Sequence, residues 1–139
     1  MIDFVLIQEA VSGIGLFKFK GKTVAIEPGH EDLFNGFMSA FQGIIKELKL
    51  GNLNQISTTD HHCIFHSEQN KKGNPYNIII MFDCEDCVEH WKEKAKAIGC
   101  EFIKQFGNVD FAGNTSIYTP FRDKILEILE VDAQYCTWE

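Results

Sequence analysis

The chain has no excess of basic residues, and this lack argues against two common kinds of partner. It holds 13 Lys and Arg against 20 Asp and Glu among 139 residues, a net charge of -7 with an isoelectric point near 5.2. Affinity for nucleic acid depends on clustered Lys and Arg that release counterions from phosphates. A polybasic membrane anchor needs the same clustering. The composition therefore predicts neither nucleic-acid binding nor electrostatic attachment to a lipid surface.

Long apolar runs and a basic leader are also missing. Apolar stretches such as Tyr76–Phe82 fall far short of the roughly 20 residues that cross a membrane. The first four residues include no basic side chain, and the apolar run that they begin is interrupted at Gln8 and Glu9. Five cysteines, an odd number, indicate reduced thiols and no disulfide framework. The expected location is therefore the cytoplasm, with contact to membranes only through partners.

What the chain does contain is enough apolar sequence for one core, because 45% of its residues are hydrophobic and 24% are charged. Two runs, Ile2–Gln8 and Tyr76–Phe82, are almost continuously apolar, as strands buried on both faces of a sheet are. We expect them side by side in the middle of the sheet. Residues 16–20 alternate apolar and charged after a glycine-containing turn, which predicts a hairpin with the first strand. The run Thr23–Ile26 either extends that second strand or belongs to a loop.

Three helices and two further short strands complete the predicted order, β-β-α-β-β-β-α-α. Apolar residues recur at spacings of three and four in each predicted helix, and these helices are His30–Leu50, Cys84–Phe106 and Phe121–Glu130. Asp83 is expected to cap the second helix. The two short strands are Asn54–Thr59 and His62–Ser67. Residues 1–131 are expected to form one α/β (α+β) domain, followed by a tail of residues 132–139.

This order resembles the longin domain over about residues 2–130. Four local features carry the resemblance: the turn at residues 12–17, the small residues between large ones at 33–41, the strand exit at 78–83, and the loop from 113 into Phe121. Longin and roadblock domains share a profilin-like layout, and two strands precede the first helix in longins, as they do here. The resemblance implies a five-stranded antiparallel sheet with one helix on one face and two on the other.

The resemblance also implies a role. Longin-like domains occur in vesicle-tethering subunits, adaptor small chains, SNAREs and the signal-recognition-particle receptor, and they pair as platforms for small GTPases. This chain lacks the heptads of a SNARE and is similar in size to sedlin-type tethering subunits or adaptor small chains. The implied function is a non-catalytic protein–protein interaction module without a cofactor. It would dimerise with itself or with another longin- or roadblock-type protein, and bind or regulate a small GTPase or a membrane-trafficking complex.

The first predicted helix is the expected binding surface. Its apolar positions cover an arc of roughly 140°, and small residues lie along one flank, which suggests that something packs close to it. Alternatively, the wide arc simply covers a wide sheet. In longin and roadblock pairs this helix and the neighbouring strand, here about Asn52–Thr59, commonly form the dimer interface. The expected partner-binding residues are Phe34, Gly36, Phe37, Ala40, Phe41, Gly43, Asn52, Asn54, Ile56 and Thr58.

The main alternative is a small zinc-stabilised or metal-sensing domain. Zinc prefers Cys and His in tetrahedral sets, often from two short clusters, and the candidate ligands are His62, His66, Cys84 and Cys87. The other interpretation is a buried or surface position for each of them.

Acidic neighbours of Cys84 oppose thiolate formation and so disfavour redox chemistry. No phosphate-binding loop is expected at Gly13, because a strand and not a helix follows it; an enzyme is therefore not predicted.

Overall fold

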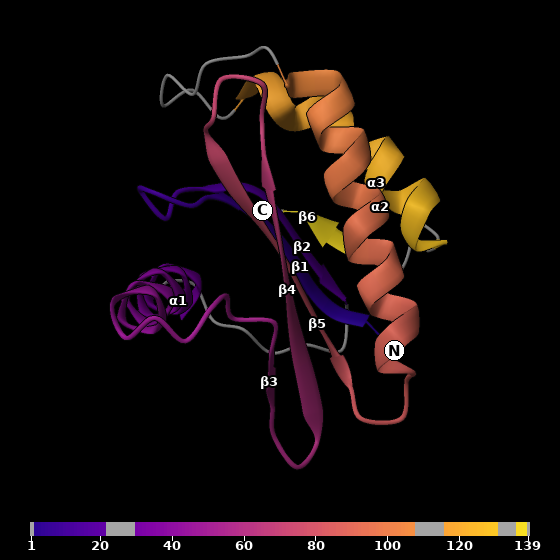
Figure 1. Cartoon of the computed structure of the whole chain (residues 1–139). Coiled ribbons are helices and arrows are strands. Elements are labelled where there is room, and N and C mark those ends of the chain that lie inside the picture. Colours follow the sequence, from indigo (N-terminus) through magenta and orange to yellow (C-terminus); the bar gives the residue numbers. More distant parts are fainter. Residues whose placement is uncertain (1, 22–29, 108–115, 131–135, 139) are drawn as a thin grey trace.

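The computed structural model describes residues 2–21, 30–107, 116–130 and 136–138, which form one antiparallel sheet with helices on both faces (Figure 1). Across the sheet the strands follow the order β3-β4-β5-β1-β2-β6. Their bounds are β1 Ile2–Glu9, β2 Gly15–Gly21, β3 Gln55–Ser57, β4 His61–Gln69, β5 Pro75–Asp83 and β6 Cys136–Trp138. The helices are α1 His30–Glu47, α2 Val88–Phe106, the 3-10 helix η1 Ser116–Phe121 and α3 Arg122–Leu129.

The two most apolar strands lie at the centre of the sheet, and the prediction that they are neighbours is confirmed. β1 pairs with β5 from Ile2 opposite Phe82 to Glu9 opposite Tyr76. Every residue of β1 is buried, as a strand covered on both faces must be. On its other side β1 forms the expected hairpin with β2. The turn between them includes Gly13, whose φ of 75° is a conformation that glycine adopts without strain.

Two hydrophobic clusters lie on opposite faces of the sheet because successive strand residues point to opposite sides. The larger cluster joins β1, β2 and β5 to α2, η1 and α3, and its aromatic centre is Phe102, which is fully buried and contacts the rings of Tyr76, Tyr118 and Phe121. The smaller cluster lies on the face toward α1. Figure 1 shows this division, with α1 on one side of the sheet and α2 and α3 on the other, as predicted.

Helix α2 packs tightly across β4. Gly99 is buried, and a Cβ atom built there would lie 2.7 Å from Cγ of Glu68 and 3.0 Å from Cδ2 of His66. The apolar stripe expected for this helix begins at Cys87 or Val88. It is buried at Trp91, Ala95, Ile98, Phe102 and Phe106, whereas Val88 is half-buried and Cys87 is exposed. Among the described residues, no helix combines the length and the apolar character that a bilayer crossing demands.

Several sequence predictions need correction. The five predicted antiparallel strands are all present, and a sixth, Cys136–Trp138, from the segment expected to be a tail, extends the sheet by pairing with β2. Helix α1 ends at Glu47, before the expected Leu50. The predicted strand at residues 54–59 contracts to β3, and the one at 62–67 lengthens to β4. The run at residues 23–26 lies outside the described residues.

The start of α2 was also predicted wrongly. β5 continues to Asp83, and a turn separates it from the first helical residue, Val88. Cys87 therefore occupies the N-cap position, without a side-chain capping hydrogen bond. The Asp83 carboxylate instead accepts a hydrogen bond from the backbone N–H of Glu85 at 3.2 Å, within the turn. An aspartate suits a turn as well as a helix cap, so its position in the sequence alone does not distinguish the two.

Candidate protein-binding surface

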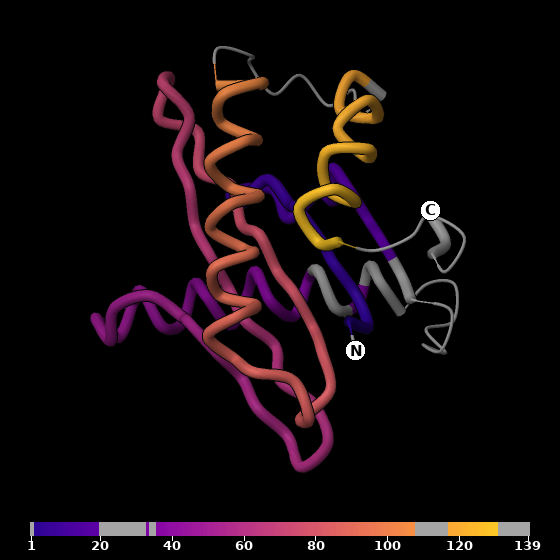
Figure 2. The backbone as a smooth tube through the Cα atoms, turned by 90° about the vertical axis from the view of Figure 1, so that its right-hand side faces the viewer, coloured from indigo at the N-terminus to yellow at the C-terminus, as the bar shows by residue number. Residues whose placement is uncertain are grey.

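Helix α1 is attached to the sheet by a small part of its surface. Of the α1 side chains that the structure describes, Met38 is the one that is fully buried, at 4% exposure. Figure 2 shows α1 running across the direction of α2, on the far side of the sheet. A polar contact adds to this attachment: Nδ2 of Asn77, in β5, donates to Oε1 of Gln42 at 2.9 Å and to Oε1 of Gln8 at 3.0 Å. Because Asn77 is buried, these hydrogen bonds fix which side of α1 faces the sheet.

The opposite side of α1 exposes large apolar side chains. On α1, Leu33, Phe37 and Ile44 are 71%, 59% and 56% exposed, and Leu48, in the turn directly after the helix, is 62% exposed. Phe41 is half-buried, and its ring stacks on that of Phe37 with centroids 5.8 Å apart. At ~100° per residue these five positions fall within an arc of about 80°, centred roughly 140° away from Gln42. We call this set of five residues the α1 stripe.

The exposure of the α1 stripe bears on one of the alternatives that the sequence left open. If the wide apolar arc served only to cover the sheet, its residues would be buried. Instead four of the large side chains are more than half exposed, so the part of the arc that they form has no cover within the described chain. Contiguous apolar surface of this kind is uncommon on monomeric proteins and marks sites of association.

The small residues of α1 do not mark a close contact inside the chain. A Cβ atom added at Gly36 or at Gly43 would meet nothing within 4 Å. Both glycines border hollows between α1 and the sheet: Gly43 lines a cavity of about 500 Å³, and Gly36 lines one of about 340 Å³ near the β1–β2 turn. Ser39 lies between them and lines both. The glycines thus leave space beside α1, and within the described chain nothing fills it.

Strand β3 forms one edge of the sheet. Among the described residues it pairs only with β4, from Gln55 opposite Ile64 to Ser57 opposite His62. The segment that follows α1 leads directly into this strand, so the α1 stripe and the β3 edge are consecutive in the chain. An edge strand offers unpaired backbone groups to a second chain.

The predicted binding residues fall into three groups. On α1, Phe37 and Ala40 are exposed and Phe41 is half-buried, whereas the side chain of Phe34 lies outside the described residues. Near β3, three residues are exposed, and they are Asn52, Asn54 and Thr58. Ile56 is half-buried and packs against the smaller cluster, toward the core. The sequence-based list omitted Leu33, Ile44 and Leu48, which belong to the same helical period but could not be assigned to a face without the sheet.

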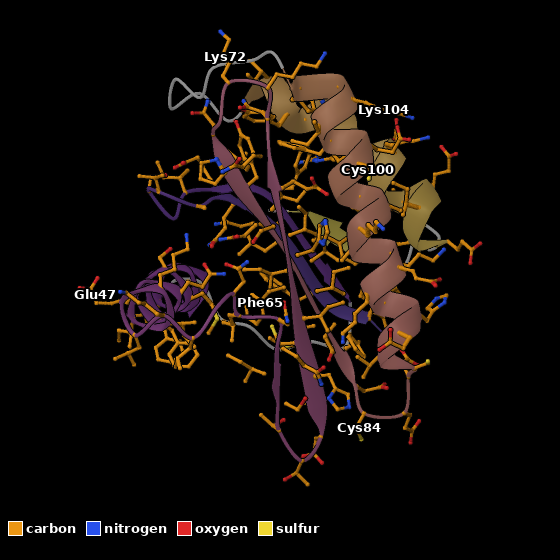
Figure 3. The ribbon with its side chains drawn as sticks, in the orientation of Figure 1. Glu47, Phe65, Lys72, Cys84, Cys100 and Lys104 are labelled. Carbon is orange, nitrogen blue, oxygen red and sulfur yellow. The ribbon has the colours of Figure 1, made fainter. Side chains whose placement is uncertain are left out.

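The candidate metal ligands are not brought together. His62 and His66 lie on one face of β4, roughly 13 Å apart at the rise of an extended strand. Nε2 of His66 is 2.6 Å from Oε1 of Glu68, beneath α2. Cys84 and Cys87 are exposed at the turn before α2, and Figure 3 shows Cys84 at the end of the sheet remote from Lys72. Within the described ranges, no three His, Cys, Asp or Glu side chains are grouped so that they could hold a metal ion.

Two histidine contacts near the same end of the sheet involve different residues. Nδ1 of His61 lies 2.7 Å from Oδ2 of Asp3, and Nδ1 of His62 lies 2.7 Å from Oγ of Ser57. A catalytic serine needs one histidine that contacts both the hydroxyl and a carboxylate. Here the carboxylate and the hydroxyl contact neighbouring histidines, whose side chains point to opposite faces of β4. These four residues therefore do not form a triad.

Burial also changes the chemistry of one cysteine. Cys63, in β4, lies in the smaller cluster, and desolvation raises the pKa of its thiol from the ordinary 9.0 to about 12. This thiol is neutral at physiological pH and behaves as a small apolar side chain. It therefore belongs to the core beneath α1.

The sequence matches no model of a known protein family and has no significant relative among curated proteins.

Proposed function

We propose that this chain is a non-catalytic, longin-like protein–protein interaction module that dimerises through α1. The observation that carries the proposal is the α1 stripe, where Leu33, Phe37, Ile44 and Leu48 are each more than half exposed. Burying one such side chain contributes about 1.5–3 kcal/mol, so a partner that covers the stripe would gain stability from every residue in it. A cluster of large apolar anchors at the centre of a contact is typical of interfaces.

The shape of the stripe favours a partner that contributes a helix. This partner is a second copy of this chain or a related longin- or roadblock-type protein. The spacing from Phe37 through Phe41 and Ile44 to Leu48 is four, three and four residues, the spacing of a seam between two packed helices. The β3 edge lies next along the chain and can extend such a contact by strand pairing. The role itself, binding or regulating a small GTPase or a membrane-trafficking complex, follows from the resemblance to longin domains.

Sedimentation equilibrium on the full chain tests the dimer, with two isoleucines as a matched pair. Ile44 lies in the stripe at 56% exposure, and Ile117 lies in η1, beyond the opposite face of the sheet, at 43% exposure. Ile44→Asp would place a charge in the interface and should weaken the dimer by at least about 100-fold, which corresponds to roughly 3 kcal/mol. Ile117→Asp should leave the dimer unchanged.

A monomer at high concentration would rule out a homodimer, and equal effects of the two substitutions would rule out the α1 stripe as its interface. The wider role needs a second assay. Purified small GTPases, each loaded with GDP or with a GTP analogue, would be tested for binding to immobilised full chain. We expect at least one to bind in a nucleotide-dependent way; a complete panel without binding would contradict the GTPase role and leave the trafficking-complex subunit as the partner to test.

A further inference from the structure

A cavity of about 500 Å³ lies between α1 and the sheet, and its volume is within the range of small-molecule binding pockets. One wall is a face of α1 whose lining residues share helical spacing, and they are Ser39, Gln42, Gly43 and Lys46. At ~100° per residue this face is centred roughly opposite the α1 stripe. The cavity is therefore separate from the proposed dimer interface.

The hydroxyl group of Ser39 is the observation that points to a ligand. Its Oγ atom is buried and has no hydrogen-bond partner within the described chain. Buried polar atoms nearly always have a partner. A serine in a helix can bond the carbonyl oxygen four residues before it, but this one does not. Because Ser39 lines the cavity, a molecule bound there would supply the missing partner.

A second donor is the side-chain amide of Gln42. Its Oε1 atom accepts a hydrogen bond from Nδ2 of Asn77 at 2.9 Å. Asn77 is buried and is itself held in place, since Nδ2 also donates to Gln8 at 3.0 Å and Oδ1 accepts from Oγ of Ser67 at 3.1 Å. These bonds fix the Gln42 amide at the cavity wall. Its NH₂ group has no partner within the described residues and is available to a ligand.

The charge that faces the cavity is positive. Two charged residues line it, Lys46 and Glu68. The carboxylate of Glu68 is turned to the opposite face of the sheet, where its Oε1 lies 2.6 Å from Nε2 of His66 beneath α2. Lys46 is exposed and forms no ion pair within the described chain. Its ammonium group is therefore available to an anion at the mouth of the cavity.

We propose that this cavity binds a small organic anion that also carries hydroxyl groups. A phosphate or carboxylate of the ligand contacts Lys46, and its hydroxyl oxygens accept hydrogen bonds from Gln42 and Ser39. These three donors span about 10 Å along the helix axis, so a molecule the size of a phosphorylated sugar is needed to contact all of them. Apolar side chains that suit its carbon skeleton line the same cavity, and they are Ala10, Val11, Leu53 and Pro75.

Titration of the full chain with three matched sugars, followed by backbone amide NMR, tests the proposal. Glucose 6-phosphate carries a phosphate, glucuronate carries a carboxylate, and glucose carries neither. We expect at least one of the two anions to bind with a Kd below about 1 mM. Glucose should bind at least about tenfold more weakly, because hydrogen bonds to charged groups are the stronger ones. The tighter anion identifies the acidic group that the site takes, and shifts at residues 39–46 and 51–53 locate it.

Two lysines provide matched variants. Lys46 lines the cavity, whereas Lys49 is exposed and lies outside it. Lys46→Gln should weaken binding of the anion about tenfold, and Lys49→Gln should change it by less than about twofold. A second pair tests the cavity itself. Gly43→Leu narrows this cavity and should abolish binding, whereas Gly36→Leu, which borders a different cavity of α1, should not. A Cβ atom meets nothing within 4 Å at either glycine, so both variants are expected to fold.

The proposal is overturned if neither anion binds, if glucose binds as tightly as the anions, or if the two lysine variants lose equal affinity. Shifts confined to η1 and α3 would also overturn it. Repeating the titration with Ile44→Asp separates this site from the proposed function. Anion binding should persist in that variant even when the dimer is lost, because Ile44 lies in the α1 stripe on the other side of the helix.

Discussion

Replacing Phe102 by alanine is expected to lower the free energy of unfolding by about 3–5 kcal/mol, whereas the same change at Phe37 should lower it by less than about 0.5 kcal/mol. Phe102 is fully buried, and its ring contacts four other aromatic rings at centroid distances between 5.0 and 5.7 Å. Its removal forfeits roughly 1.5–3 kcal/mol of apolar burial and leaves a cavity that adds a comparable amount. Phe37 is 59% exposed and stacks on Phe41 alone among the ring contacts of the described residues.

Urea denaturation at low micromolar concentration, where a dimer contributes least, measures both variants. With a slope of about 2 kcal/mol per molar urea, Phe102→Ala should shift the midpoint downward by roughly 2 M and Phe37→Ala by almost nothing. The urea midpoint of the unsubstituted chain, followed by circular dichroism, is the reference for both variants. If the two variants lose similar stability, Phe37 lies in a core contact and the division between the core and the α1 stripe is refuted.

Three further predictions follow from single contacts. Asn77→Leu removes the hydrogen bonds to the side-chain oxygens of Gln8 and Gln42, so the free energy of unfolding should fall by about 1–3 kcal/mol. The backbone amides of α1 should then exchange hydrogen faster, and unchanged exchange would contradict the attachment of α1 through Asn77. Gly99→Ala should destabilise by about 1–3 kcal/mol and Gly43→Ala should stabilise by about 0.5–1 kcal/mol, as thermal melts would reveal. Burial raises the pKa of the Cys63 thiol from 9.0 to about 12. The neutral thiol therefore contributes stability that is complete below pH 9.0 and is lost as the pH rises toward 12. At pH 8, alkylation followed by mass spectrometry should modify Cys84 and spare Cys63.

Strong local patterns explain which parts of the fold could be predicted from the sequence. The continuous apolar runs of β1 and β5 leave little choice but central strands, and the 3.6-residue period from Trp91 to Phe106 predicts both the helix and its buried face. These features depend on neighbours in the sequence.

The remaining parts depend on contacts that the sequence does not display. β6 has three residues, and its conformation is set by pairing with β2, which is distant in the chain. Helix α2 begins later than predicted because Asp83 ends a strand instead of capping a helix. On α1 the apolar period was visible, but the side that faces the sheet is fixed by the hydrogen bond from Asn77 to Gln42. Without that contact, Ile44 and Leu48 could not be recognised as surface residues.

Hydrogen–deuterium exchange as a function of protein concentration tests the binding role of α1 most directly. The full chain would be labelled at low and at high micromolar concentration, and protection would be read peptide by peptide. Covering the α1 stripe should slow exchange across α1 and β3 at the higher concentration, while η1 and α3 exchange at the same rate in both samples. Protection that rises with concentration in η1 and α3, with α1 unchanged, would contradict an interface at the α1 stripe.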